Sequence, residues 1–201
     1  MAHRGALFLD ELPEFPVSVL ESLRQPLEER VVRISRAGAA LQFPADFMLV
    51  ACANACPCGR EKSVCRCSDV QRARYGRRLS APLLDRFDLR VWIQEIGSAP
   101  VASSDHVGER VAHAVERQRF RLRGTPWRRN AHVPAGALER YVELQPEARA
   151  AWHSICEFGS FTGRGAARIR RVARTIADLA DRAEIAVDDL EAASFLRVDS
   201  W

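Results

Sequence analysis

The sequence has almost no lysine and no long apolar run. Lys62 is the single lysine among 30 basic side chains in 201 residues, so arginine carries nearly all of the positive charge. The longest apolar stretch, residues 47–59, is interrupted by Asn54 and Pro57, and it is shorter than the roughly 18 to 20 residues of a membrane-spanning helix. Asp10 and Glu11 directly follow the first apolar run, so we expect no secretory signal peptide. These absences predict a cytoplasmic protein with no membrane partner.

The overall composition is that of a globular protein, with 47% hydrophobic and 28% charged residues, which argues against disorder. The net charge of +4 is unevenly distributed along the chain. Residues 1–30 carry three arginines against six acids, whereas residues 110–130 carry seven arginines against one acid. Because the guanidinium fork binds phosphate oxygens, this pattern suits a protein that handles phosphates. Solvated helix faces explain the arginine clusters equally well.

A short apolar stretch, residues 6–9, ends in two adjacent carboxylates, Asp10 and Glu11. The stretch predicts a buried parallel strand, and ligands of open α/β sheets bind at the carboxyl ends of such strands. One carboxylate there can hold a magnesium ion while the other polarises an attacking water, as in nucleotide hydrolysis. This is the Walker B pattern, which also occurs at ordinary strand ends.

A second apolar stretch, residues 47–51, predicts another buried strand that leads to Asn54. Beside the first strand, the Asn54 amide would orient the same water. The local sequence is equally compatible with Asn54 as a turn residue before Pro57.

Between these strands the sequence predicts a helix followed by a hairpin. Apolar residues at helical spacing from Val17 to Leu27 predict an amphipathic helix, which Pro26 should stop or kink near Arg24 or Gln25. Residues 31–35 and 40–43 flank a short turn that contains glycine, and they predict a β-hairpin.

Five of the six cysteines lie between residues 52 and 67. Four of them form the pattern C-x-C-x6-C-x-C: Cys56, Cys58, Cys65 and Cys67. Clustered thiols in a reducing compartment favour a metal over disulfides, and four thiolates can close a tetrahedral structural zinc site. The spacing differs from the common two-residue knuckle, so unliganded thiols remain the alternative. We expect Cys52 and Cys156 to be small buried apolar residues.

Several stretches together resemble the magnesium-chelatase-like AAA+ ATPases of the competence-protein-M type. From about His3 to Arg197, the resemblance is carried by GALFLDELPEF, SLRQPLEE, ISRAG, FPADFMLVACAN, CPCG, RRLSAPLLDRFDL and RVARTIADL. It implies an α/β fold: the C-terminal part of an AAA+ P-loop NTPase core, with parallel strands, a helix and a presensor-1 β-hairpin, followed by an all-α lid domain. It also implies a hexameric ring that uses ATP and Mg²⁺ to move on DNA and to promote branch migration in natural transformation.

The resemblance also assigns roles to individual residues. Asp10 would bind the magnesium of Mg-ATP, Glu11 would be the catalytic base and Asn54 would be sensor 1. Arg86 would be an arginine finger, because a guanidinium supplied by a neighbouring subunit stabilises the charge on the γ-phosphate. Without the resemblance, we would expect Arg86 to form a salt bridge with Asp85 or Asp88.

Arg164 matches sensor 2 at the start of a lid helix. The family usually has Ser-Ala before this arginine, whereas Thr162-Gly163 stands here, which leaves the helix start open. Arg171 and Arg174 follow at helical spacing, and we expect structural or DNA-facing roles for them.

The hairpin corresponds to the presensor-1 hairpin, which points into the central channel of related ring helicases. Arg33 and Arg36 would therefore contact DNA phosphates without reading sequence and with strong salt dependence. A surface hairpin with two solvated arginines is the alternative.

We expect a partial AAA+ core over residues 1–96, a linker over 97–104 and a helical lid over 105–201. A strand at residues 89–93 should close the core. Helices should cover residues 146–158, 166–183 and 188–196, after a helical stretch that starts near residue 107. The arginine-rich interval 117–130 suits either a nucleic-acid backbone or a solvated helix end, and we favour the helix end.

The sequence contains no Gly-rich loop of the form G-x-x-x-x-G-K-[ST], the Walker A motif that cradles ATP phosphates. We therefore expect the chain to be the C-terminal portion of such an ATPase, inactive alone and binding ATP weakly or not at all. A separate Walker A-bearing half would be its partner. Two alternatives remain: a magnesium-chelatase motor subunit, and a non-catalytic, zinc-stabilised module that binds DNA or a ring.

Overall fold

The computed structural model describes residues 2–36, 39–60, 64–93, 104–159 and 161–197. The protein has the mixed α/β architecture that the sequence predicts. The chain divides into two compact units, residues 1–87 and residues 88–200, and each unit is described separately below. The predicted core boundary at residue 96 and most of the predicted linker lie outside the described residues, so these bounds stay predictions.

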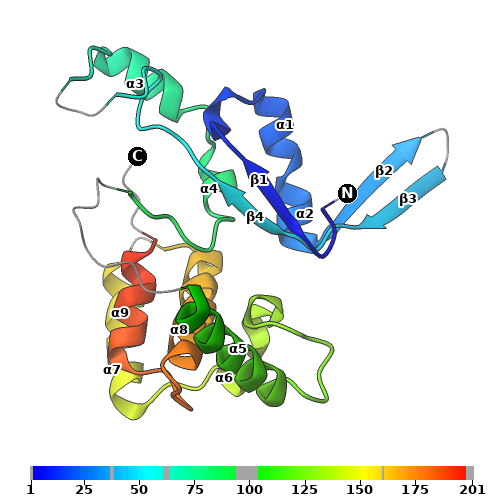
Figure 1. Cartoon of the computed structure of the whole chain (residues 1–201), viewed down its shortest axis with the longest axis vertical. Helices are drawn as coiled ribbons and strands as arrows, with labels where there is room; N and C mark the ends of the chain where they lie inside the picture. Colours follow the sequence, from blue (N-terminus) through cyan, green and yellow to red (C-terminus); the bar gives the residue numbers. More distant parts are fainter. Residues whose placement is uncertain (1, 37–38, 61–63, 94–103, 160, 198–201) are drawn as a thin grey trace. The chain divides into compact units, whose positions relative to one another are not determined.

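The first unit contains two parallel strands, β1 (Ala6–Leu9) and β4 (Met48–Ala51), in the register that pairs Leu9 with Ala51. Figure 1 shows β1 alongside β4. On one face of this pair, Leu9 and Ala51 pack against a small core. The buried members of that core are Leu12, Leu20, Leu79 and Leu83.

The opposite face of the pair is uncovered. Phe8, which is 61% exposed, lies beside Val50 in the register, and Met48 at the start of β4 is also exposed. The prediction of two buried strands was therefore wrong for this face. The physical reason is that the described residues pack a core against one side of the two-stranded sheet only.

Two short helices, α1 (Val17–Ser22) and α2 (Arg24–Glu29), replace the single amphipathic helix. The break falls at Leu23, so that Pro26 lies in the first turn of α2, where its missing N–H removes no helical hydrogen bond. Arg30 ends α2 in a left-handed conformation and leads into the next strand.

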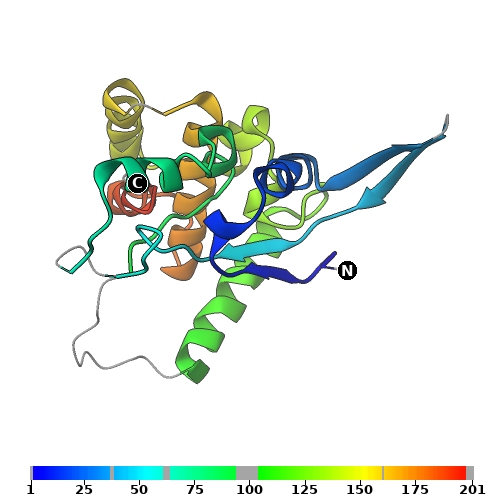
Figure 2. The same cartoon turned by 90° about the horizontal axis from the view of Figure 1, so that it is seen from above.

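Strands β2 (Val31–Arg36) and β3 (Ala39–Pro44) form the predicted antiparallel hairpin. In both Figure 1 and Figure 2 the hairpin extends away from α1 and α2. Residues 37–38 of its turn lie outside the described residues.

Two helices after the cysteine segment begin at serine caps. The Ser68 side chain accepts the Gln71 N–H and completes a capping box at the start of α3 (Asp69–Gly76). The Ser80 hydroxyl accepts the Leu83 N–H at 3.2 Å and caps α4 (Ala81–Leu84).

The strand predicted at residues 89–93 is absent from the described residues. The Arg90 N–H donates instead to the Leu196 carbonyl at 2.7 Å, and the Arg90 side chain donates to the Arg197 carbonyl at 3.0 Å. No described strand lies beside this stretch, so the Arg90 N–H finds its hydrogen-bond acceptor at the end of a helix.

The second unit is helical, as predicted. Its long helices are α5 (Ser104–Arg121), α7 (Pro146–Phe158), α8 (Gly163–Leu179) and α9 (Val187–Phe195). The short helices η2 (Asn130–His132), η3 (Ala135–Ala137) and α6 (Leu138–Tyr141) connect α5 to α7. Helix α8 contacts α5, α6 and α9, and it supplies the buried residues Ile169, Ala173 and Ala177 to the core. Among the described helices, none is long and apolar enough to cross a membrane.

A buried ionic network joins α5 to α8. The Asp178 carboxylate accepts hydrogen bonds from both terminal nitrogens of Arg121, at 2.7 and 2.6 Å, and from Asn130 Nδ2 at 2.9 Å. Arg174, one turn earlier on α8, lies 3.2 Å from Asp178 and is fully buried. Desolvation lowers the pKa of Arg174, although Asp178 opposes that shift. Burial of Arg174 beside Asp178 gives it a structural role, which is one of the two roles expected for it.

Candidate functional site

The two acids and the asparagine lie at the same end of the β1–β4 pair. The Cys52 N–H donates to the Leu9 carbonyl at 3.0 Å, and the Leu12 N–H donates to the Cys52 carbonyl at 2.8 Å. These bonds continue the pairing beyond the strands, so Asp10 follows β1 at the level where Cys52 follows β4. Asn54 comes two residues later on the same strand end.

Asp10 is held by two donors on one oxygen. Its Oδ1 accepts the Glu11 N–H at 2.9 Å and the Cys52 thiol at 2.8 Å. Both donors bind Oδ1. Because Asp10 is exposed, its second carboxylate oxygen, Oδ2, can bind a cation. A carboxylate oriented in this way fits Mg²⁺, which prefers oxygen ligands.

Cys52 is exposed, which corrects the expectation that it is buried. It stands just after β4, and its thiol donates to a carboxylate instead of packing in the core. The hydrogen bond from its thiol to Asp10 raises the pKa of Cys52. Cys156 on α7 is also exposed, because it lies on a side of that helix that the described core does not cover.

Glu11 turns the chain sharply between β1 and the short helix η1 (Leu12–Glu14). Its backbone is left-handed, with φ 49° and ψ 47°, a conformation that non-glycine residues rarely adopt. Such outliers gather at functional sites. The Glu11 side chain is exposed, as a residue that activates a water must be.

Asn54 is also exposed, and it lies against the cysteine segment. A Cβ added to Gly59 would lie 3.5 Å from Asn54 Nδ2. Gly59 has φ +65°, and its N–H donates to the Cys56 carbonyl at 3.1 Å. The turn that carries the cysteines therefore comes close enough to Asn54 that any side chain at position 59 would contact the Asn54 amide.

Arg86 is largely buried within the first unit. Its Nε donates to the Arg24 carbonyl at 3.1 Å and lies 3.3 Å from Glu28 Oε2, and its Nη1 donates to the Pro82 carbonyl at 2.5 Å. Arg86 therefore forms a salt bridge with Glu28, a partner other than the Asp85 or Asp88 that the residues alone suggested. Asp88 pairs with Arg168 at 2.6 Å.

Arg164 is exposed in the first turn of α8, in the second unit. Thr162 caps this helix by accepting the Gly165 N–H at 3.0 Å, so threonine replaces the family's serine without loss of the cap. The helix consequently begins three residues before the predicted start at Ala166. The Arg171 guanidinium donates to the Val133 carbonyl at 2.8 Å, which gives it a structural role.

The four clustered cysteines converge. The sulfur atoms of Cys56, Cys58, Cys65 and Cys67 all lie within 4.8 Å of one another. The Cys56 sulfur is 3.3 Å from that of Cys58 and 3.4 Å from that of Cys65. Zinc–sulfur bonds of about 2.3 Å place tetrahedral sulfur atoms about 3.8 Å apart, so the donor set fits zinc with little adjustment.

Two of these thiols have a lowered pKa. The Arg60 N–H and then the Cys56 thiol lower the pKa of Cys58 to about 6. The Cys67 N–H lowers the pKa of Cys65, whereas the pKa values of Cys56 and Cys67 are raised because their protons bind the neighbouring sulfur atoms. A metal would displace the remaining protons.

The two hairpin arginines lie in different surroundings. In the register of the hairpin, Arg33 lies opposite Gln42 and Arg36 lies opposite Ala39. Because Arg33 and Arg36 are three residues apart on the same strand, their side chains point to opposite faces of the hairpin. Arg33 forms an ion pair with Glu29. Arg36 is exposed near the tip. The phosphate contact predicted for both stays a prediction, and the geometry favours Arg36.

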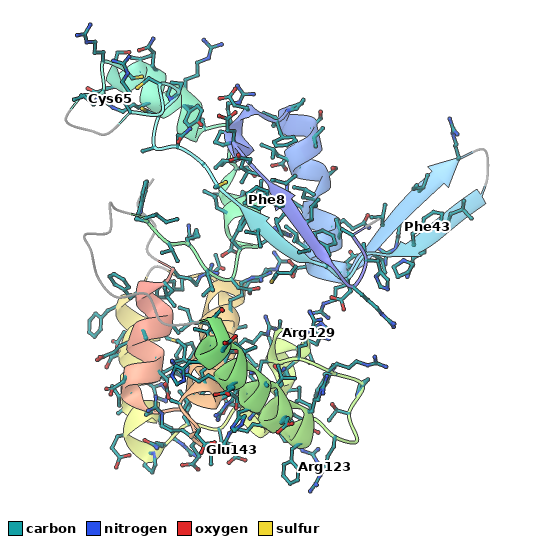
Figure 3. All side chains as sticks on the ribbon, viewed as in Figure 1. Phe8, Phe43, Cys65, Arg123, Arg129 and Glu143 are labelled. Atoms are coloured by element: carbon teal, nitrogen blue, oxygen red, sulfur yellow. The ribbon has the colours of Figure 1, made fainter. Side chains whose placement is uncertain are left out.

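In the arginine-rich interval 117–130, Arg117 pairs with Asp181 and Arg121 binds Asp178. Arg123 stacks on the Phe120 ring, 3.9 Å from its centroid, and Arg129 is exposed (Figure 3). The interval is therefore partly structural, as a helix end would be.

Sequence reasoning missed the contact between Cys52 and Asp10. The signal was present, because Cys52 directly follows the strand that was expected to lie beside the Walker B strand. The small size of the side chain favoured a core role instead.

Two family models match the chain: "Magnesium chelatase, subunit ChlI" over residues 1–101 and "Magnesium chelatase, subunit ChlI C-terminal" over residues 101–197. The chain is 38% identical over 192 residues to competence protein ComM of Haemophilus influenzae, covering 92% of this chain and 37% of that protein. It is 37% identical over 211 residues to the uncharacterized protein YifB of Escherichia coli, covering 99% of this chain and 40% of that protein.

An uncharacterized protein of Mycobacterium tuberculosis is 38% identical over 202 residues, covering 98% of this chain and 40% of that protein. The chain thus spans about 40% of the length of these curated relatives. Because the two family models together account for residues 1–197, the chain belongs to the magnesium chelatase ChlI family, which its similarity to ComM and YifB supports.

Proposed function

We propose that this chain supplies the Walker B, sensor and lid residues of a magnesium-chelatase-like AAA+ ATPase that acts on DNA. The observation that carries the proposal is that Asp10, Glu11 and Asn54 follow the strands at the same end of the β1–β4 pair. Family membership and the ComM relative support the same function.

In this proposal each side chain has a separate task. Asp10 would hold Mg²⁺, and its Oδ1 accepts hydrogen bonds from the Cys52 thiol and the Glu11 N–H, which orient the carboxylate. When bound, magnesium neutralises charge on the β- and γ-phosphates of ATP. Glu11 accepts a proton from the attacking water, and the Asn54 amide orients that water.

The two arginines complete the assignment. Arg164, exposed in the first turn of α8, binds nucleotide phosphate as sensor 2. Arg86 acts in a ring as the finger for a neighbouring subunit. That role requires Arg86 to leave Glu28 and the Arg24 carbonyl, so we infer that subunit contact and release of this ion pair are linked.

The uncovered face of the β1–β4 pair supports a partner segment that carries Walker A. Phe8, Val50 and Met48 form a contiguous apolar surface on this face. Another layer of an α/β core would cover it, because both faces of parallel sheets are normally buried. The sequence itself has no Walker A motif, so we expect the isolated chain to bind ATP weakly or not at all.

Reconstitution tests the proposal. The purified chain should hydrolyse little ATP, and a separately expressed Walker A-bearing segment should restore DNA-stimulated hydrolysis. Glu11→Gln should then lower the rate roughly 10²- to 10⁴-fold, since a general base contributes that much. Glu14→Gln, three residues away and exposed, is the matched control. Rapid hydrolysis by the chain alone, or full activity of Glu11→Gln, would contradict the proposal.

A second proposal concerns the four cysteines, which we infer hold one structural zinc ion. The closed set of four sulfur donors leaves no open position for catalysis. The ion would fix the turn that comes close to Asn54. If no ATPase activity can be reconstituted, the cysteine site favours the alternative of a non-catalytic, zinc-stabilised module.

A further inference from the structure

The segment around the cysteines is the most basic small structure in the first unit. We call residues 56–78 the cysteine module. It contains six arginines and Lys62 against two acids, Glu61 and Asp69, a net charge of +5. A zinc tetrathiolate would add two negative charges and leave +3. The surplus therefore exceeds what is needed to neutralise the metal site.

Some of these arginines have internal roles. Arg72 donates to the Cys67 carbonyl at 2.6 Å and pairs with Asp69, and it also lies 3.7 Å from the Cys65 sulfur. Arg78 donates to the Glu14 and Phe15 carbonyls. These contacts hold the module together and attach it to η1.

Four other arginines have no such role. Their side chains are exposed, and none of them forms an ion pair with another residue that the structure describes: Arg60, Arg66, Arg74 and Arg77. Arg66 lies between two of the clustered cysteines, and Arg74 and Arg77 are three residues apart at the end of α3, so they are neighbours on its surface. In Figure 3, side chains with nitrogen ends project outward from the module around Cys65.

We propose that these four arginines form a surface that binds the phosphate backbone of DNA. Guanidinium groups that are exposed and unpaired bind phosphate bidentately without first breaking an internal ion pair. The sole aromatic residue of the module, Tyr75, is buried, so the module offers no exposed aromatic ring on which a base could stack. Binding should therefore be independent of sequence and strongly dependent on salt.

The cysteine cluster gives the surface its rigidity. Arg66 and Arg60 lie one and two residues from a clustered cysteine, so a metal ion that fixes the sulfur atoms also fixes the backbone that carries these arginines. The same turn comes close to Asn54 at Gly59. DNA on this surface would consequently lie next to the residue proposed as sensor 1. The inference rests on the proposed function in taking DNA as the partner.

Fluorescence anisotropy of the whole 201-residue chain tests the surface. The probes are a labelled single-stranded oligonucleotide of mixed sequence and a duplex of the same length. Arg66→Gln/Arg74→Gln should weaken binding by on the order of tenfold per lost contact at 0.1 M salt, and should reduce the salt slope by about 0.7 per contact on single strands. Arg110→Gln/Arg149→Gln, which removes two exposed arginines of the second unit, is the charge-matched control.

The outcomes separate this inference from the proposed function. Equal losses in both double variants would show a general charge effect and overturn the inference. No loss in Arg66→Gln/Arg74→Gln, while the wild-type chain binds DNA, would overturn the inference and leave the ATPase proposal standing. A wild-type chain that binds no DNA would also overturn it, while reconstituted ATP hydrolysis judges the ATPase proposal separately. Competition by polyglutamate equal to that by DNA would assign the surface to an acidic protein instead.

Discussion

Replacement of Asp178 by asparagine should destabilise the second unit far more than the same replacement at Asp181. Asp178 is 1% exposed and binds Arg121 through both oxygens, while the fully buried Arg174 lies 3.2 Å away. Asp178→Asn removes the compensating charge but leaves both guanidinium groups in place. Loss of one partner of a buried ion pair typically costs about 3–5 kcal/mol, against a total domain stability of about 5–15 kcal/mol.

Asp181→Asn provides the matched control. Asp181 is 85% exposed and pairs with Arg117, so the expected loss is about 0–1 kcal/mol. Asparagine also tolerates the left-handed backbone of Asp181, with φ 58°, so the substitution adds little strain.

Urea unfolding measured by circular dichroism distinguishes the two variants. With a slope of about 2 kcal/mol per molar urea, Asp178→Asn should lower the midpoint by about 2 M and Asp181→Asn by less than about 0.5 M. If the two free energies of unfolding differ by less than about 1 kcal/mol, the buried network does not carry the stability assigned to it here.

Three further predictions follow from individual contacts. The Ser80 hydroxyl donates to Glu21 Oε1 at 2.5 Å and lowers the pKa of Glu21. The ionised Glu21 should therefore stabilise the fold at neutral pH, and this stabilisation should disappear as the pH falls through the folded-state pKa of Glu21. Glu21→Gln should therefore lower stability by less than about 1 kcal/mol at neutral pH and by nothing at low pH, and a difference that persists in acid would refute this. Elemental analysis under reducing conditions should find about one zinc ion per chain, retained in Cys156→Ser and lost in Cys65→Ser; its absence from the wild type would remove the metal site. Phe8→Glu should weaken association with a Walker A-bearing segment in a pull-down while leaving the circular dichroism spectrum unchanged, and unchanged association would show that this face is not the contact.

Elements whose signals are local in the chain could be predicted from the residues alone. Alternating residues around a glycine turn indicated the β2–β3 hairpin, and apolar spacing indicated α7 and α9 nearly to the residue. Two acids after one strand and Asn54 after the next were enough to predict a shared edge, because parallel neighbours end at the same side of a sheet. The spacing of the four cysteines likewise predicted that they cluster, and their sulfur atoms lie within 4.8 Å of one another. Such signals depend on residues close together in the chain.

Which of many similar residues are buried or paired depends on the three-dimensional fold and could not be predicted from the residues alone. Arg174 is fully buried, although its sequence was equally compatible with a DNA-facing position, because burial depends on helices distant in the sequence. Cys52 was expected in the core, but its thiol donates a hydrogen bond to Asp10, which lies 42 positions earlier in the sequence. Residues 89–93 read as a strand but lack a described partner strand, and a strand needs a partner to satisfy its backbone. The residue types at positions 10 and 11 indicated their chemistry, whereas the contacts that orient Asp10 are formed by residues distant in the sequence.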